Sequence, residues 1–224
     1  MTRRQLMGAA LVRTVLGFGL LGACFFTSAG TLRYWPAWIY LGVLFVPMMI
    51  ALAVLVRRDP ALLERRLKMK EKERGQSRII KAATVIFLTA LVIPGLDYRF
   101  GWSAMSMGVV IAANAVVVAS YLLFFRVLME NSYAARTIEV SEDQEVISTG
   151  PYAIVRHPMY TAVFIMYTAT PLALGSYWGL IPFLGLPAIL TLRIFGEEET
   201  LRRELPGYAE YCERVRWRLL PGIW

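Results

Sequence analysis

Long apolar stretches, each bounded by polar or turn-forming positions, dominate the pattern of this chain. Six of them approach the length, about 17 to 25 residues, that an α-helix needs to cross the hydrocarbon core of a bilayer. The pattern therefore predicts an all-α, polytopic integral membrane protein with about six transmembrane helices, or five without the stretch that carries Lys81. The six stretches cover Thr14 to Gly30, Trp35 to Val56, Ile79 to Leu96, Ala104 to Phe125, Met159 to Gly175 and Tyr177 to Phe195.

The first stretch has an alternative interpretation as a cleaved signal peptide. Three arginines, Arg3, Arg4 and Arg13, lie before or at its start, and Thr27 to Ala29 loosely resembles a cleavage site. The last two stretches are separated only by Gly175 and Ser176, which predicts a C-terminal helical hairpin followed by a helical tail.

Basic residues gather in one interval between the predicted spans. The segment Arg57 to Lys81 holds ten basic residues and four acidic ones, whereas each bridge at the other ends of the spans carries at most one basic residue. By the positive-inside rule we expect the large loops, both termini and any active site to be cytoplasmic, in a bacterial inner membrane. Leu62, Leu63, Leu67 and Met69 lie among these charges and predict an amphipathic helix at the interface, held by anionic lipid headgroups.

Charge and composition narrow the class of protein further. Only 18% of the residues are charged, against about 25% in soluble domains. The net charge of +8 is distributed between long apolar runs, which argues against a nucleic-acid partner. One histidine and two distant cysteines give no metal-ligand pattern and no disulfide framework.

Gly17 to Gly22 matches the dinucleotide-binding pattern G-x-G-x-x-G letter by letter. That pattern needs a strand before it and an acidic residue about 20 positions later, and neither is present here. We interpret these glycines as small residues that let one membrane helix pack against another.

Polar and aromatic groups are densest between Thr149 and Tyr160, at the entry to the fifth stretch. Gly150-Pro151 predicts a turn, and Pro158 suits the first turn of the next helix, where free N–H groups could meet a ligand. His157 and Tyr160 would share one face of that helix. An interfacial anchor is an equally good interpretation of the spacing alone.

A second cluster follows the sixth stretch. Arg193 and Glu197 are one helical turn apart, and an arginine at an apolar helix end needs a partner or a ligand. Solvated pairs of Glu198 with Arg202 and of Glu199 with Arg203 explain the next residues. The aromatic residues of the tail suit either the membrane interface or a pocket wall; they are Tyr208, Trp217 and Trp224.

Four motifs, in this order and spacing, resemble the isoprenylcysteine carboxyl methyltransferase family and its bacterial relatives. They are Thr-Gly-Pro-Tyr-x-x-x-Arg-His-Pro-x-Tyr (149–160), Glu-Glu-x-x-Leu (197–201), Gly-Tyr-x-x-Tyr (207–211) and Arg-Val-x-x-Arg-x-x-Pro (214–221). The resemblance covers residues 137–224, which we take as the catalytic region, and residues 1–136 as the N-terminal membrane helices with the basic loop. Ala162 stands where the family often has glycine.

The resemblance implies a membrane enzyme that uses S-adenosyl-L-methionine, with Arg193 and His157 as the catalytic residues. Carried over by position, the cofactor contacts fall on Gln144, Glu145, Val146, Ile147, Tyr152, His157, Pro158, Met159, Tyr160 and Glu197. No metal is implied. The substrate would be a lipophilic or lipidated acceptor entering from the bilayer, so membrane lipids are the expected surroundings.

The resemblance does not by itself identify the methyl acceptor. Arg193 would orient a carboxylate such as an isoprenylcysteine-like compound, which needs no general base. A phospholipid amine or a thiol must lose a proton, for which Glu197, Glu198 or His157 are candidates. A sterol-type NADPH reductase, whose C-terminal half is similar, and a non-catalytic membrane protein are the remaining alternatives.

Overall fold

The computed structural model describes residues 3–67, 74–134, 140 and 143–224, with the backbone alone for residues 74–82. This part of the chain contains helices and no strand, which confirms the predicted all-α class. The elements are α1 (Arg3–Ala29), α2 (Trp35–Arg58), α3 (Pro60–Leu67), α4 (Arg74–Phe100), α5 (Met107–Glu130), the 3₁₀ helix η1 (Gly150–Ala153), α6 (Pro158–Ala173), α7 (Leu180–Phe183), α8 (Leu186–Glu204) and α9 (Tyr208–Arg214).

Five segments in the described residues are long and apolar enough to cross a membrane. They are Arg3–Ala29, Trp35–Arg58, Ala83–Phe100, Met107–Glu130 and Leu180–Glu204. The expected span at Met159 to Gly175 forms α6, but this helix has 16 residues and is shorter than the other spans. The last apolar stretch is predicted to end at Phe195, and α8 continues beyond it as a polar helix to Glu204. The prediction of a polytopic membrane protein is confirmed.

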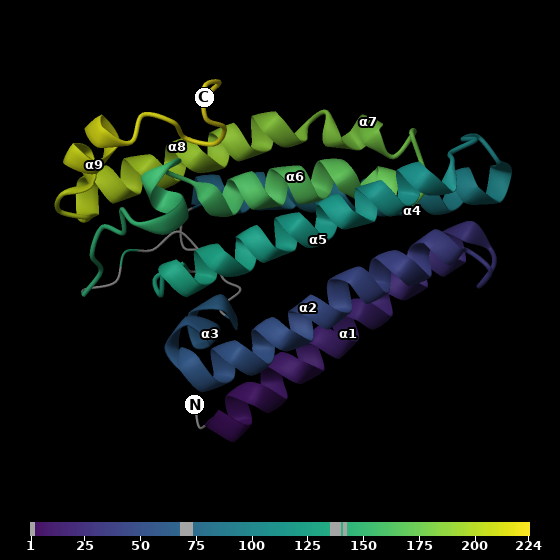
Figure 1. Ribbon diagram of the computed structural model, residues 1–224, viewed down its shortest axis with the longest axis horizontal. Helices are drawn as coiled ribbons and strands as arrows, with labels where there is room; N and C mark the ends of the chain where they lie inside the picture. The colour runs from purple at the N-terminus through teal and green to yellow at the C-terminus, as the bar shows by residue number, and fades with distance from the viewer. Residues whose placement is uncertain (1–2, 68–73, 135–139, 141–142) are drawn as a thin grey trace.

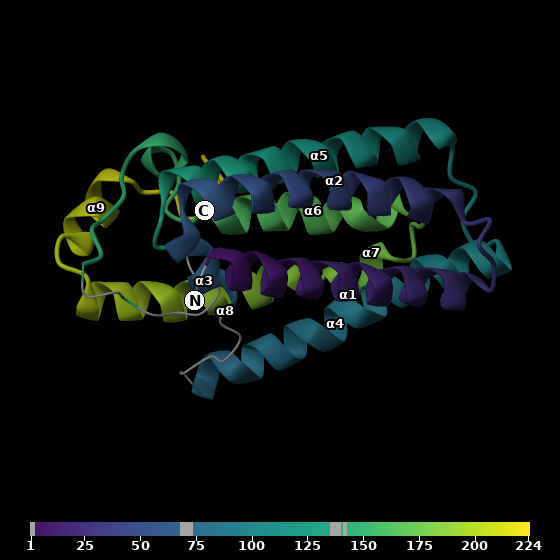
Figure 2. The same ribbon diagram turned by 90° about the horizontal axis from the view of Figure 1, so that it is seen from below.

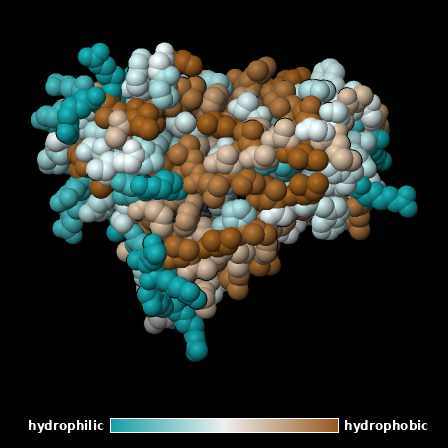
Figure 3. Space-filling model, in the orientation of Figure 1, coloured by the Kyte–Doolittle hydropathy of each residue, from teal (hydrophilic) through white to brown (hydrophobic). Residues whose placement is uncertain are grey.

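The long helices run side by side, and the short polar elements gather at one end of the bundle (Figures 1 and 2). Helix α5 packs along α6, and α1 packs against α2 and α4. Brown apolar surface covers much of the length of the body in Figure 3, while teal polar groups lie at its ends. Large apolar side chains of the long helices, such as Leu20 and Ile50, are exposed, as expected of residues that face lipid.

Polar bonds inside the bundle fix the position of α6. The Asn114 amide of α5 donates to the Ala173 carbonyl oxygen at 3.1 Å, and the hydroxyl groups of Tyr40 and Thr170 are 2.8 Å apart. Such bonds add to packing where no water competes for the groups. These bonds tie α6 to α5 and to α2.

A buried carboxylate closes the end of the bundle that lies opposite α9. Asp97, which is 1% exposed, accepts hydrogen bonds from the Ser103 N–H at 2.7 Å and the Ser103 hydroxyl at 2.6 Å. The Ser176 hydroxyl also donates to it. Asp97 therefore joins the end of α4, the segment before α5 and the turn after α6.

Replacing Asp97 with asparagine is expected to destabilise the protein by about 1–3 kcal/mol, because buried donors lose a charged acceptor. The thermal midpoint in detergent measures the effect. The exposed Glu210→Gln change is the control and is expected to stay within about 0.5 kcal/mol. Equal midpoints for both variants would contradict this role of Asp97.

Helix α3 carries the leucines of the predicted amphipathic helix, and their contacts are with other helices of the protein. Leu62 and Leu63 are buried against apolar residues of α1 and α2, so its apolar face packs on protein. Arg65 donates to the Ser132 carbonyl oxygen and Arg66 to that of Ala134, both at 2.9 Å. Met69 lies outside the described residues.

The glycines of α1 only partly fit the packing interpretation. A side chain at Gly22 would contact Leu41 of α2 at 3.7 Å, but at Gly17 and Gly19 nothing lies within 4 Å. Gly22 therefore lies on the packed side of α1 at an ordinary contact distance that a small side chain would also fit, while Gly17 and Gly19 are not at a helix contact. Helix α1 is packed into the bundle, where its Phe25 is fully buried.

Candidate functional site

The N-terminal end of α6 is held in place by the C-terminal tail. Helix α6 begins at Pro158, as predicted, with His157 before it as the capping residue. The Arg156 N–H donates to the Trp217 carbonyl oxygen at 2.8 Å, and the His157 N–H donates to that of Arg218 at 2.9 Å. The tail thus fixes the backbone on which the motif histidine stands.

The predicted turn at Gly150-Pro151 forms the short helix η1. Gly150 has a φ of +55°, a left-handed conformation that glycine adopts without strain. A Cβ atom at this position would lie 2.8 Å from the carboxyl carbon of Glu130. The Glu130 carboxylate accepts a hydrogen bond from the Thr149 hydroxyl, so this glycine lets the end of α5 approach the turn.

The Gly150→Ala change is expected to lower the thermal midpoint through about 1–2 kcal/mol of backbone strain and through loss of the Thr149–Glu130 bond. Gly101→Ala is the matched control, since Gly101 has a φ of +66° but a Cβ atom there would meet nothing within 4 Å. A midpoint no lower than that of Gly101→Ala would show that the Glu130 contact contributes nothing.

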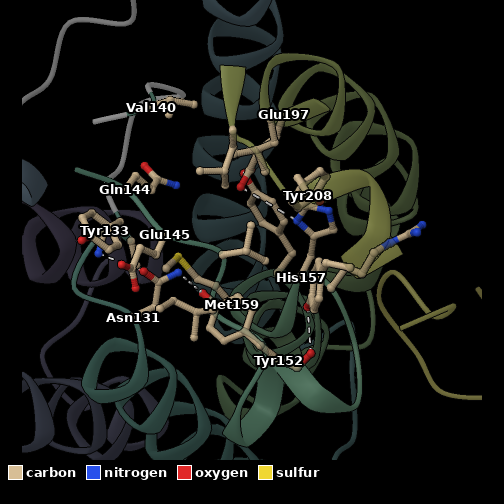
Figure 4. Close-up of a pocket in the computed structure, with 18 of the residues that line it drawn as sticks. Asn131, Tyr133, Val140, Gln144, Glu145, Tyr152, His157, Met159, Glu197 and Tyr208 are labelled. Atoms are coloured by element: carbon tan, nitrogen blue, oxygen red, sulfur yellow. Dashed lines mark hydrogen bonds and ion pairs between the residues drawn. The ribbon is translucent and has the colours of Figure 1, made fainter. Parts of the chain in front are cut away.

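A cavity lies between the start of α6, the polar half of α8, α9 and the segments that follow α5 (Figure 4). Its empty space is about 870 Å³ when the part open to solvent is included. The lining residues are Asn131, Tyr133, Ala134, Val140, Gln144, Glu145, Val146, Ile147, Tyr152, Arg156, His157, Met159, Tyr160, Arg193, Glu197, Leu201, Leu205, Tyr208 and Tyr211.

A chain of polar contacts joins α6 to α8 in this cavity. The Tyr160 hydroxyl donates to Glu197 Oε2 at 2.6 Å, and Arg193 Nε donates to the same hydroxyl oxygen at 3.3 Å. The second carboxylate oxygen, Glu197 Oε1, lies 3.9 Å from His157 Nδ1. The hairpin therefore brings Arg193, Glu197 and His157 together, as the sequence predicts.

The interpretation of Glu198 and Arg202 as a solvated pair is wrong, because Glu198 is buried. Its side chain is 2% exposed, and it is surrounded by nitrogen atoms from three segments of the chain. Arg202 Nη2 does lie at 3.4 Å, but the remaining partners are distant in sequence. They are Arg156 Nε at 3.0 Å, His157 Nε2 at 3.3 Å and Arg218 Nε at 3.2 Å.

Helix α9 supplies an aromatic wall that the sequence left undecided. Tyr208 and Tyr211 are both buried, and the Tyr211 hydroxyl donates to the Tyr152 carbonyl oxygen at 2.7 Å. Burial raises the pKa of the Tyr208 and Tyr211 phenols well above the ordinary value. Burial also raises the pKa of Tyr152 to about 12, although a hydrogen bond from Asn131 opposes this. These phenols are therefore neutral at physiological pH.

The cavity gathers most of the residues that the resemblance singled out. Nine of the ten predicted cofactor contacts line it, together with Arg193. Pro158 is buried and is not a lining residue; its part is to start α6. Leu201 and Tyr211 also line the cavity; they belong to the quoted motifs but were not assigned as contacts. Sequence reasoning missed five further lining residues, which carry no motif. They are Asn131, Tyr133, Ala134, Val140 and Leu205.

The described residues contain no group of three or more His, Cys, Asp or Glu side chains that could hold a metal ion. The Tyr208 hydroxyl is buried and has no hydrogen-bond partner within this part of the chain. The cavity thus offers carboxylate, imidazole, guanidinium and phenol groups beside apolar walls.

Residues 108–206 match the family model for phospholipid methyltransferases (PEMT). The matched stretch runs from α5 through α8 and includes most of the cavity lining. A match of this kind implies a membrane methyltransferase and leaves the acceptor open. A comparison with curated proteins finds no match.

Proposed function

We propose that this protein is an integral membrane methyltransferase that transfers the methyl group of S-adenosyl-L-methionine to a lipophilic acceptor arriving from the bilayer. The observation that carries the proposal is the cavity where α6 and α8 meet, because it collects Glu197, His157, Tyr160 and Arg193 beside apolar walls. The family match over the same region supports methyl transfer as the reaction.

The residues of the cavity fit such a cofactor. One part is apolar and aromatic and could receive the adenine ring; it is formed by Val140, Val146, Leu201, Leu205, Tyr208 and Tyr211. The other part is polar, and Glu197 and His157 suit the ammonium group of an amino acid moiety. The buried Tyr208 hydroxyl, which lacks a protein partner among the described residues, could contact a ligand after a small shift.

When bound, the cofactor supplies a methyl group on a sulfonium, and transfer to a nucleophile is an in-line displacement. Such a reaction depends mainly on the orientation of donor and acceptor and on exclusion of water. The Tyr160 hydroxyl orients the Glu197 carboxylate, and the buried rings of Tyr208 and Tyr211 keep water from one side of the cavity. These residues therefore contribute by binding and orienting the reactants.

The acceptor that Arg193 suits best is a carboxylate, for example an isoprenylcysteine-like compound. A guanidinium can form two parallel hydrogen bonds to a carboxylate, and Arg193 lies on α8 inside the last candidate span. A carboxylate is already deprotonated at neutral pH, so no general base is needed. We place the cavity at the cytoplasmic face of a bacterial inner membrane, on the basis of the basic flanks.

A phospholipid amine is the second candidate, and the family match favours it. Its ammonium group must lose a proton before attack on the methyl group, and Glu197 and His157 lie in the cavity to accept one. A screen with prenylcysteine, phosphatidylethanolamine and lipophilic thiols, in nanodiscs with labelled S-adenosylmethionine, distinguishes these acceptors by the product formed.

Calorimetry of S-adenosylmethionine and S-adenosylhomocysteine binding tests the proposal itself. We expect micromolar dissociation constants for both ligands in detergent and in nanodiscs. A folded protein that binds neither ligand in either environment would overturn the assignment as a methyltransferase.

A further inference from the structure

The carboxylate of Glu198 controls which nitrogen of His157 carries a proton. Glu198 Oε1 lies 3.3 Å from His157 Nε2, and an ionised carboxylate can only accept hydrogen bonds. Three arginines at 3.0 to 3.4 Å keep this carboxylate ionised and in place. The Nε2 atom must therefore be the donor, and in the neutral ring Nδ1 then holds the lone pair.

The Nδ1 atom lies near a second acceptor, the carboxylate of Glu197. His157 Nδ1 is 3.9 Å from Glu197 Oε1, beyond hydrogen-bonding distance, so neither atom satisfies the other. The other oxygen of Glu197 is already bonded to the Tyr160 hydroxyl. A nitrogen atom between them could lie at about 2.9 Å from both and donate a hydrogen to each.

We propose that Glu198 is a positioning residue that holds His157 in the Nε2–H form, so that Nδ1 and Glu197 together form a binding site for an ammonium group. An ammonium group can donate to both acceptors and carries a positive charge that suits a carboxylate, which a neutral alcohol or amide does not. The proposal deepens the proposed function and rests on it for the source of the ammonium group. That group belongs either to the amino acid part of the methyl donor or to an amine acceptor.

The chain has a single histidine, which makes the protonation of its ring directly measurable. Nitrogen-15-labelled histidine gives two ring resonances in an NMR spectrum, and both belong to His157. In the neutral wild-type ring we expect a protonated, pyrrole-type Nε2 and an unprotonated, pyridine-type Nδ1. A wild-type spectrum with the proton on Nδ1 would overturn the proposal whether or not any variant folds.

Ligand additions identify the source of the ammonium group. S-adenosylhomocysteine carries an ammonium group, whereas methylthioadenosine has the same nucleoside thioether without the amino acid part. We expect the former to shift Nδ1 and the latter not to. A shift caused by phosphatidylethanolamine in nanodiscs, without any by S-adenosylhomocysteine, would assign the site to the acceptor. Equal shifts with the first two ligands, or no shift with any of the three, would overturn the ammonium site.

The Glu198→Ala variant separates positioning from general stability, with the exposed Glu199→Ala as control. In folded Glu198→Ala we expect both ring tautomers and at least a roughly tenfold weaker binding of S-adenosylhomocysteine, the value of one hydrogen bond to a charged group. Methylthioadenosine binding should stay unchanged. Equal loss for both ligands would contradict the positioning role. The wild-type ring could be fixed in the Nε2–H form while the protein binds no nucleoside ligand. That result would leave the positioning role of Glu198 intact and would overturn the proposed function.

Discussion

The Glu197→Gln variant is expected to bind S-adenosylhomocysteine at least roughly 30-fold more weakly than the wild type. Glutamine preserves the shape of the side chain and an oxygen for the Tyr160 hydroxyl, but it removes the charge that would pair with an ammonium group. The Glu197 side chain is 29% exposed without ligand. Loss of one partner of a charge pair that a bound ligand buries costs about 2–5 kcal/mol, which sets this lower limit. Calorimetry in detergent measures the change.

Glu199→Gln is the matched control for this experiment. Glu199 lies on the same turn of α8, but its side chain is exposed and it is not a lining residue of the cavity. We expect its affinity to equal that of the wild type. The same loss of affinity in both variants would show that the net charge of α8, and not a contact made by Glu197, controls binding.

The Arg193→Lys variant is expected to lower kcat/KM for a carboxylate acceptor by about 10- to 100-fold, and to leave the affinity for S-adenosylhomocysteine unchanged. Lysine keeps the positive charge near Glu197 but loses the planar fork that holds a carboxylate through two bonds. Steady-state turnover with varied acceptor measures kcat/KM, and calorimetry measures the cofactor analogue. Arg203→Lys on the exposed side of α8 is the control.

The same variant also separates the two candidate acceptors. An amine acceptor has no anionic group for Arg193 at the reacting centre, so its turnover should be nearly equal in the wild type and in Arg193→Lys. An unchanged kcat/KM for a prenylcysteine substrate would therefore remove Arg193 as the residue that orients the carboxylate.

Apolar run length could predict most of the membrane helices but not their ends. Helix α6 is short because Pro158 can only begin it and because Gly175, with a φ of +79°, follows its end. Helix α8 is longer than its apolar run because good helix formers follow it, and there the buried charge of Glu198 is balanced by Arg156 and Arg218. Hydropathy counts each residue alone and cannot include such distant partners.

The site was predictable where its residues belong to a motif, and not where the fold brings single residues to it. The pair of Glu198 with Arg202 follows from helical spacing, and it is present. The partners Arg156 and Arg218 could not be found in this way, because only the fold brings the tail to the start of α6. Tyr208 shows the same limit, since its amphipathic ring suits a membrane surface as well as the cavity wall that it forms.

The contact between the tail and the start of α6 also constrains how the protein matures during synthesis. The ribosome makes the helices from α1 to α6 first, but the backbone partners of Arg156 and His157 are the carbonyl groups of Trp217 and Arg218. Side chains on α8 and α9 complete the cavity. A nascent chain in the membrane therefore lacks the complete cavity until these late segments leave the ribosome, so membrane insertion of the earlier helices precedes its assembly.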